Sequence, residues 1–245
     1  MELKEIFDHW ARRTRGRYKD KQWLLSKWEI FEGVEWPKEK VDLMTRHIAR
    51  GLNIGKSDVL LDLGCGGGWI AGALRPYAKK IFGVDISREM LFLAQEVCGR
   101  GSFVCGQAAG IPLKSESVDR VLSYFVFINI EDDWYIQQSL LEIVRVLKKG
   151  GRALLGQLPD RNGSARYDNA KGDYLRYCEG AFKIGKNIRE KESPLIKLFD
   201  RNQLAGFLDK QNIRYQFRDS FNPFYRPGEP ETVDWRFDLI LENTP

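Results

Sequence analysis

The chain alternates between short apolar runs and longer amphipathic stretches. Five apolar runs have the length and the flanking residues of buried strands, at 58–63, 80–85, 102–105, 118–124 and 151–157. Apolar positions recur at helical spacing in the stretches around them, at 37–51, 68–77, 87–97 and 133–147. This alternation of strands and helices predicts an α/β protein built on a mostly parallel sheet.

The last part of the chain predicts one more helix and two more strands. Asp200 is placed to cap a helix that runs to about residue 210, with Gln203 reaching back to complete a capping box. Residues 213–221 alternate between apolar and polar as a half-exposed strand does, and residues 234–241 form the last strand.

Two segments stand outside the strand–helix pattern. Residues 1–36 carry four of the seven tryptophans and predict helices over 2–12 and 20–31. Residues 158–194 carry scattered glycines and tyrosines directly after the fifth strand. Loops at the carboxyl ends of strands build the ligand site in doubly wound folds, so we interpret 158–194 as a substrate-covering insertion. A peripheral packing element is the alternative.

The composition is that of a soluble globular protein. With 245 residues, of which 43% are hydrophobic and 30% charged, the chain is long enough for one α/β core and short for two full domains. No apolar run reaches the ~18 residues that a membrane span needs. The N-terminus lacks a signal-peptide layout and the four cysteines lack metal-ligand spacing, so we expect a cytoplasmic setting without a metal centre.

The net charge of +5 is mild, and its main local source is the basic stretch 11–21. Charge runs of this kind ordinarily belong to a solvated helix face or a mobile arm. The alternative is attraction of an anionic substrate, such as a phosphorylated lipid, a nucleotide-sugar or RNA.

A glycine-rich turn follows the first core strand, in the sequence Asp62-Leu-Gly-Cys-Gly-Gly-Gly68. Glycines at a strand-to-helix turn let the backbone bend tightly and let a ligand lie directly against it. An acid inside an apolar strand must find hydrogen-bond donors or a cationic partner, because burying it unpaired is costly. The spacing departs from the dinucleotide loop, since Trp69 stands where the third glycine belongs, and no Gly-Lys-Ser/Thr of a P-loop follows.

A second acid, Asp85, ends the next strand, one strand–loop–helix–strand unit after Asp62. An acid at the tip of this strand can accept hydrogen bonds from both ribose hydroxyls of a nucleoside cofactor. The alternative is that Asp85 caps the helix that follows it.

The spacing Asp-x-Gly-x-Gly-x-Gly resembles the signature loop of class I S-adenosylmethionine-dependent methyltransferases. Residues 106–113 and 117–125 resemble the third and fourth strands of that family with their linker, and Leu147-Lys-Lys-Gly-Gly-Arg-Ala-Leu-Leu155 resembles its turn into the fifth strand. The resemblance implies a Rossmann-like, seven-stranded, mostly parallel sheet with helices on both faces and an antiparallel last strand. It also implies an N-terminal helical lid over 1–36 and a methyltransferase core over 37–245.

The resemblance implies S-adenosyl-L-methionine as the cofactor and a set of residues that contact it. These are Asp62, Gly64, Cys65, Gly66, Asp85, Ile86, Gln107, Ala108 and Phe125. In the family, the acid at Asp62 faces the methionine end of the cofactor, partly through water. Relatives commonly carry Asp-Ala where this chain has Gln107-Ala108, and the amide oxygen of Gln107 could accept the same hydrogen bond from the adenine.

The resemblance implies methyl transfer from S-adenosyl-L-methionine to a nucleophile that the protein aligns. An alcohol or phenol that acts as this nucleophile also needs a general base. The chain has two histidines. His47 lies at the edge of a predicted helix, and we interpret it as structural. His9, in the N-terminal lid, is a candidate base or substrate contact; a surface or packing histidine is the alternative.

Trp10, Tyr18 and Asn129 complete the candidate substrate contacts. Tyr18 also lies where it could touch the carboxylate end of the cofactor, with Arg15 or Arg17 as a charge partner. Asn129 falls where many relatives carry a histidine that faces the substrate, but an amide is a poor base. Asp132 and Asp133 are either bases or, as we favour, the N-terminal cap of the next helix.

The sequence therefore predicts methyl transfer to an oxygen or nitrogen of a small-molecule acceptor, such as a metabolite or a glycan or lipid precursor. The basic stretch suggests an RNA methyltransferase as an alternative, and the lack of an obvious base suggests a non-catalytic cofactor-binding scaffold. The segment 123–131 has no Asn-Pro-Pro-Tyr-type sequence, which disfavours methylation of nucleic-acid bases. The sequence specifies neither the acceptor nor the oligomeric state.

Overall fold

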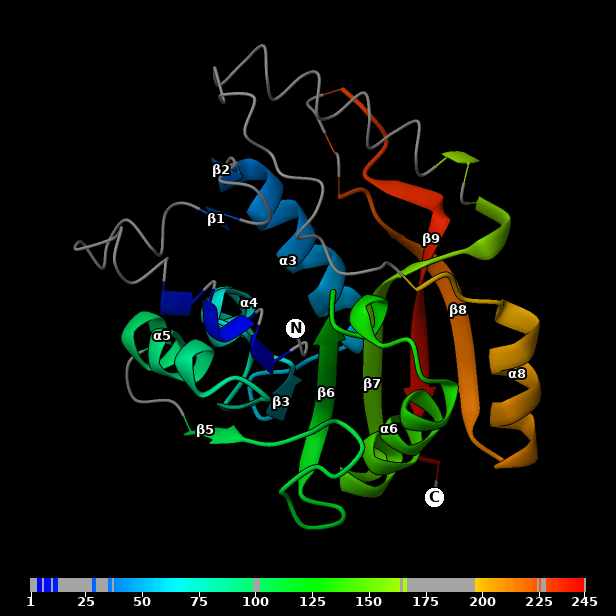
Figure 1. Ribbon diagram of the computed structural model, residues 1–245, viewed down its shortest axis with the longest axis horizontal. Helices are drawn as coiled ribbons and strands as arrows, with labels where there is room; N and C mark the ends of the chain where they lie inside the picture. The colour runs from blue at the N-terminus through cyan, green and yellow to red at the C-terminus, as the bar shows by residue number, and fades with distance from the viewer. Residues whose placement is uncertain are drawn as a thin grey trace.

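The computed structural model describes residues 4–5, 7–9, 11–12, 28–29, 35–36, 38–98, 102–163, 165–166, 197–223, 225 and 228–244. Their centre is a seven-stranded sheet of order β5-β4-β3-β6-β7-β9-β8 (Figure 1). The strands are β3 (Val59–Leu63), β4 (Lys80–Asp85), β5 (Ser102–Cys105), β6 (Val118–Tyr124), β7 (Leu147–Pro159), β8 (Arg214–Phe221) and β9 (Thr232–Glu242). Strands β3 to β7 pair in parallel, and β9 lies antiparallel between β7 and β8. The fold predicted from the resemblance is therefore confirmed.

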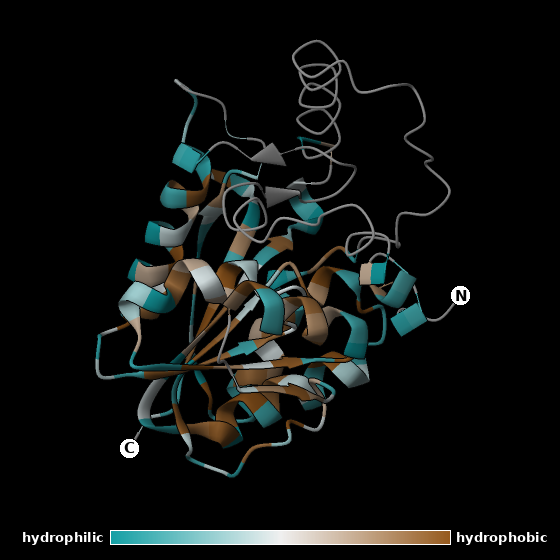
Figure 2. Ribbon diagram, turned by 90° about the vertical axis from the view of Figure 1, so that its left-hand side faces the viewer, coloured by the Kyte–Doolittle hydropathy of each residue, from teal (hydrophilic) through white to brown (hydrophobic). Residues whose placement is uncertain are grey.

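Helices cover both faces of this sheet. They are α3 (Lys38–Leu52), α4 (Trp69–Leu74), α5 (Arg88–Cys98), α6 (Asp133–Val146) and α8 (Arg201–Lys210), with short 3-10 turns η1 (Arg75–Tyr77), η2 (Phe127–Asn129) and η3 (Arg161–Gly163). Successive strand residues point to opposite faces, so Leu60 packs with α3 and α4, whereas Leu61 packs with α6 and α8. The hydrophobic residues consequently concentrate in the sheet and on the inner faces of the helices (Figure 2).

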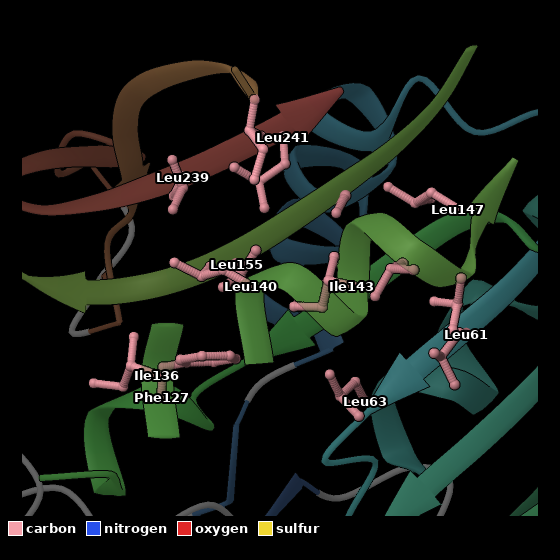
Figure 3. Packing of buried hydrophobic residues seen from close by; sticks show 14 of the residues in the cluster. Leu61, Leu63, Phe127, Ile136, Leu140, Ile143, Leu147, Leu155, Leu239 and Leu241 are labelled. Carbon is pink, nitrogen blue, oxygen red and sulfur yellow. The ribbon is translucent and has the colours of Figure 1, made fainter. Parts of the chain in front are cut away.

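The core beneath α6 shows how this packing positions the carboxyl ends of the strands. Ile136, Leu140 and Ile143 of α6 lie over the sheet and form one buried cluster with leucines of β3, β7 and β9 (Figure 3). Phe127 of η2, directly after β6, is buried in the same cluster. The turns that follow β3 and β6 therefore start from a rigid layer, which is what a precise binding site requires.

Predicted element boundaries hold closely in the core and fail in three places. Helix 68–77 is divided into α4 and η1, because Pro76 cannot continue an α-helix. Strand β7 begins at Leu147 rather than at residue 151, because Leu147 already pairs with Val118. The predicted helix 20–31 is wrong at β1 (Trp28–Glu29), which pairs antiparallel with β2 (Glu35–Trp36); pairing with a neighbouring strand overrides a local helical pattern.

Two aspartates that the sequence analysis singled out lie at the N-termini of helices. Asp132 caps α6 by accepting hydrogen bonds from the backbone of Trp134 and Tyr135, so the capping interpretation is confirmed. Asp200 caps α8 in the same way. The capping box is wrong in its second half, because the Gln203 side chain donates to Asp133 at the start of α6 instead.

The N-terminal segment is helical at residues 4–5, 7–9 and 11–12, in agreement with the helix predicted over 2–12. The division into a lid over 1–36 and a core over 37–245 stays a prediction. Across the described ranges, we find no helix with the length and apolarity to span a bilayer.

Candidate active site

The two acids singled out in the sequence lie on neighbouring strands at the carboxyl edge of the sheet. Asp62 of β3 is the register partner of Gly83 in β4, so Asp85, two residues further along β4, lies on the same face. Both carboxylates are buried, with Asp62 2% and Asp85 8% exposed. Two buried acids side by side at the end of a parallel sheet must each be neutralised by protonation or satisfied by hydrogen-bond donors.

The glycine-rich turn is tied to β4 by backbone hydrogen bonds. The amides of Gly64 and Cys65 both donate to the carbonyl of Val84, at 2.7 Å and 3.1 Å. Gly64 has a φ of +77°, and a Cβ there would overlap the side chain of Val126. Gly66 has a φ of +49°, and a Cβ there would meet nothing within 4 Å. The turn therefore has a closed side against β6 and an open side at Gly66 where a ligand can approach the backbone.

Asp85 holds the glycine-rich turn and the start of α5 together. Its Oδ2 atom accepts from the Gly66 amide at 2.8 Å, and its Oδ1 atom accepts from the Ser87 amide at 2.9 Å. The cap of α5 is Ser87, whose hydroxyl accepts from the Met90 amide at 3.1 Å. The alternative interpretation of Asp85 as a helix cap is therefore wrong, and each of its oxygens keeps capacity to accept a further hydrogen bond.

Asp62 has an incomplete set of partners. Its Oδ2 atom is buried and has no hydrogen-bond partner within the described residues. Burial first, and then repulsion from Asp85, raise the pKa of Asp62 to about 7. Burial also raises the pKa of Asp85. A positively charged or hydrogen-bonding ligand at this edge would relieve both effects.

The residues predicted for the adenine side lie beside these acids. Cys105 is the register partner of Asp85, and its thiol donates to the carbonyl of Ile86 at 3.5 Å. Gln107 is exposed and pairs with Gly110 through an isolated bridge, and Ala108 is half-buried between them. Ile86, Gln107 and Ala108 are thus brought to the same edge as Asp85.

Cys65, within the glycine-rich turn, is buried. Burial, followed by the nearby acids Asp62 and Asp85, raises the pKa of its thiol well above the usual range. A neutral, buried thiol is a packing group rather than a nucleophile. Cys65 therefore belongs to the wall of the site and not to its chemistry.

The end of β6 forms the next part of this edge. Phe125 has a φ of +61° and is half-buried, with its ring packed edge-on against Tyr124 at 5.1 Å between centroids. The Asn129 side chain donates to the backbone carbonyls of Phe125 and Val126, at 3.1 Å and 3.4 Å. Asn129 thus stabilises the turn after β6, a structural role that the sequence analysis did not predict.

The remaining candidates are placed as follows. His9 lies on the N-terminal helical segment and is exposed. His47 lies in α3 with its Nε2 atom 2.8 Å from Asp238, which agrees with a structural role. Asp133 forms an ion pair with Lys197 rather than facing the site. Trp10 and Tyr18 lie outside the described residues.

The sequence analysis missed two residues that hydrogen-bond towards Asp85. Ser87 connects α5 to Asp85, and Asp8 contacts Ser87 from the N-terminal segment. Ser87 could have been found, because serine at the start of an apolar-periodic stretch is the common N-cap signal. Asp8 could not, because nothing in the local sequence predicts a contact across 79 positions.

Comparison with known proteins identifies methyltransferases as relatives of this chain. A family model described as a methyltransferase domain matches residues 61–155. A demethylmenaquinone methyltransferase from Thermotoga maritima is 31% identical over 202 residues, which cover 75% of this chain and 87% of the relative. The uncharacterized methyltransferase YcgJ from Bacillus subtilis is 31% identical over 165 residues, which cover 64% of this chain and 62% of the relative.

A solved S-adenosylmethionine-dependent methyltransferase from Thermotoga maritima has the same fold, with a TM-score of 0.62 at 17% identity, covering 99% of this chain and 100% of that one. The chain spans only 19% to 62% of the length of three curated relatives. The chain belongs to the class I S-adenosylmethionine-dependent methyltransferase family. Its cofactor is therefore S-adenosyl-L-methionine.

The residues at this edge suit that cofactor. The Oδ2 atom of Asp62, which has no partner among the described residues, can accept from an ammonium group or a water, and its charge favours a nearby sulfonium. The remaining lone pairs of Asp85 can accept from ribose hydroxyls, and the open side of Gly66 leaves room for close approach.

Proposed function

We propose that the chain transfers a methyl group from S-adenosyl-L-methionine to an oxygen or nitrogen of a small-molecule acceptor, such as a metabolite or a glycan or lipid precursor. The observation that carries the proposal is the pair of buried acids, Asp62 and Asp85, around a glycine-rich turn with an open side. The bound cofactor supplies an electrophilic methyl group, and the protein binds and orients the reactants.

In this proposal, the described residues divide into two parts of one site. Asp85 accepts from the ribose, Gln107 and Ala108 lie along the adenine, and Phe125 packs against the cofactor. Asp62 faces the methionine end.

Tyr124 is excluded as a base, because burial raises its pKa and its hydroxyl accepts a hydrogen bond from Gln157. The acceptor is therefore expected to react as an amine, or as an oxygen that loses its proton readily.

The attachment of the 158–194 segment supports its role as a cover for the acceptor. Its flanks are held at the carboxyl end of β7, where Asp160 pairs with Phe199 and its carboxylate lies 2.7 Å from Arg201. The chain re-enters beside η2, where the Lys197 amide donates to the carbonyl of Ile128 at 2.8 Å. The two flanks are thus attached at the carboxyl ends of β7 and β6, and the candidate cofactor-binding acids lie at the same edge of the sheet.

The relatives favour a second candidate for the methylated atom. The demethylmenaquinone methyltransferase is matched over most of its length, and a relative from Campylobacter jejuni is named as a ubiquinone/menaquinone C-methyltransferase. An electron-rich ring carbon is a nucleophile that can be activated by ionisation of its own hydroxyl group. Carbon methylation of such a ring is therefore the second candidate.

RNA methylation and a non-catalytic scaffold role would each give a different result. RNA methylation would require that binding weaken steeply with salt and with neutralisation of Arg12, Arg13, Arg15 and Arg17. A non-catalytic scaffold would bind the cofactor without turnover. A cytoplasmic setting stays part of the proposal, and it is supported by the free thiols of Cys65, Cys98 and Cys105.

Replacing Asp85 by alanine is expected to weaken binding of S-adenosylhomocysteine by about 1–3 kcal/mol, because hydrogen bonds to a charged acceptor are lost. Calorimetric titration measures this change. Asp58→Ala is the matched control, since Asp58 pairs with Arg120 at the opposite end of β3 and should leave the affinity unchanged. Unchanged affinity in a folded Asp85→Ala protein would contradict the placement of the ribose.

The proposed activity is tested in two steps. Titration with S-adenosylmethionine, S-adenosylhomocysteine and NAD should give binding of the two adenosyl ligands alone. Release of S-adenosylhomocysteine is then followed across a panel of phenols, amines and hydroquinones. Turnover with RNA alone would contradict the proposal and support RNA methylation, and binding without turnover on any acceptor would contradict it and support the scaffold role.

A further inference from the structure

The N-terminal helical segment lies against the first turns of α5, at the edge that carries the cofactor-binding acids (Figure 1). Ala11 is fully buried and packs with Met90 and Leu93 of α5, together with the partly buried Phe7. Residues 4, 7, 8 and 11 have i, i+3 and i+4 spacing, so Asp8 lies on the same helical face as Phe7 and Ala11. The segment is thus docked by an apolar contact and by one acid.

Asp8 is the polar centre of this contact. Its side chain is largely buried, with the residue 8% exposed. Its Oδ1 atom accepts from the Ser87 hydroxyl at 2.5 Å, and its Oδ2 atom lies 3.1 Å from the ammonium group of Lys4. Burial raises the pKa of Asp8, but the hydrogen bonds from Ser87 and Lys4 outweigh it and hold the pKa below its usual value. Asp8 is therefore an ionised acceptor at neutral pH.

Ser87 carries this contact to the cofactor-binding residues. Its hydroxyl donates to Asp8 and accepts from the Met90 amide, so one group joins the N-terminal segment to the start of α5. Its own amide donates to Asp85, whose other oxygen accepts from Gly66. Three consecutive hydrogen bonds thus connect Asp8 with the glycine-rich turn.

We propose that Asp8 is a positioning residue that anchors the N-terminal helix on Ser87, and that this anchor and cofactor binding strengthen each other. The inference rests on the proposed cofactor site. When the helix is docked, Ser87 is held in one rotamer and its amide is held towards Asp85. When the helix is released, the first turn of α5 loses this support and the carboxylate of Asp85 loses its fixed orientation.

Thermodynamic linkage makes the coupling testable from either side. If docking of the helix favours cofactor binding, then cofactor binding must favour docking by the same factor. Hydrogen exchange of the peptide over residues 1–12 reports docking, and calorimetry reports the affinity for S-adenosylhomocysteine. The ligand should slow exchange in the wild-type chain.

Asp8→Ala is expected to accelerate exchange over residues 1–12 without ligand and to weaken S-adenosylhomocysteine binding about tenfold, the range for one hydrogen bond to a charged group. Asp8→Asn keeps one acceptor oxygen for Ser87, so its exchange rate and its affinity should lie between those of the wild type and of Asp8→Ala. The losses of affinity caused by Ser87→Ala and by Asp8→Ala should not add in the double variant, because both substitutions remove the same hydrogen bond.

The control is Asp200→Ala, which removes a helix cap from α8 on the other face of the sheet and should leave affinity and exchange over residues 1–12 unchanged. Wild-type affinity in Asp8→Ala would overturn the proposal. Even if exchange were faster, it would show that Asp8 anchors the helix but that this anchor does not affect cofactor binding. Weaker binding with unchanged exchange would overturn it too, because Asp8 would then act on the ligand directly. A wild-type chain that binds S-adenosylhomocysteine but transfers no methyl group would instead contradict the proposed function.

Discussion

Replacing Asp238 by alanine is expected to lower the free energy of unfolding by about 3–5 kcal/mol, because it leaves a cation without its buried partner. Asp238 is fully buried in β9 beneath α3. Its Oδ2 atom accepts from His47 at 2.8 Å and from the guanidinium of Arg218 at 3.0 Å. Its Oδ1 atom accepts from the Ser220 hydroxyl at 2.6 Å.

Urea unfolding at constant pH measures this loss. The matched control is Asp234→Ala in the same strand, because Asp234 pairs with Arg166 at the surface, where both side chains are 58% exposed. An exposed pair of this kind contributes about 0–1 kcal/mol. Equal losses in the two variants would contradict the assignment of Asp238 as a buried structural charge.

The Asp238 cluster also reaches the carboxyl ends of β6 and β7. Asp238 accepts from the backbone amide of Gln157, which has a φ of +68° and is fully buried at the end of β7. The Gln157 side chain donates to the hydroxyl of Tyr124 and to the carbonyl of Phe221. Loss of Asp238 is therefore expected to loosen the ends of β6 and β8 as well as the contact with α3.

Asp62→Asn is expected to stabilise the ligand-free protein at neutral and alkaline pH. An aspartate in the unfolded chain has a pKa near 3.9, and in the folded chain burial and Asp85 raise the pKa of Asp62 to about 7. The folded state therefore binds this proton more tightly, so Asp62 lowers stability progressively as the pH rises from about 4 to about 7. Integrated over that range, the loss is about 4 kcal/mol.

The pH dependence separates this effect from a change in packing. The advantage of Asp62→Asn over the wild type should be about 4 kcal/mol near pH 8 and shrink to about 1–2 kcal/mol near pH 5. Denaturant unfolding of both proteins at the two pH values measures it. An advantage that does not change with pH, or a variant that is less stable near pH 8, would contradict the raised pKa.

The affinity for the cofactor should rise with pH, whereas the stability of the ligand-free protein falls. A positively charged ligand favours the ionised carboxylate, so S-adenosylmethionine should bind the wild type more tightly as the pH rises towards about 7. Asp62→Asn should abolish that part of the pH dependence. Asp62→Asn thus stabilises the ligand-free protein, but it removes the negative charge that favours S-adenosylmethionine in the proposed site.

Much of the fold followed from local sequence, and the sequence also located the glycine-rich turn of the candidate cofactor site. The apolar runs at β3, β4 and β6 are long enough and isolated enough to be strands, because a strand buried on both faces needs few other signals. The family spacing located the glycine-rich turn, since backbone conformation there depends on glycine itself. The antiparallel last strand followed from the family resemblance and was confirmed, and the structure places it between β7 and β8.

Tertiary structure alone decided which polar groups meet. His47 and Asp238 lie 191 positions apart and Asp8 and Ser87 lie 79 apart, and no periodicity predicts a hydrogen bond across such distances. The same holds for the protonation of Asp62, whose pKa depends on burial and on a neighbouring strand. Local sequence determines conformation through short-range sterics and periodicity, whereas charge pairing, desolvation and anchoring depend on packing, which exists only once the chain has folded.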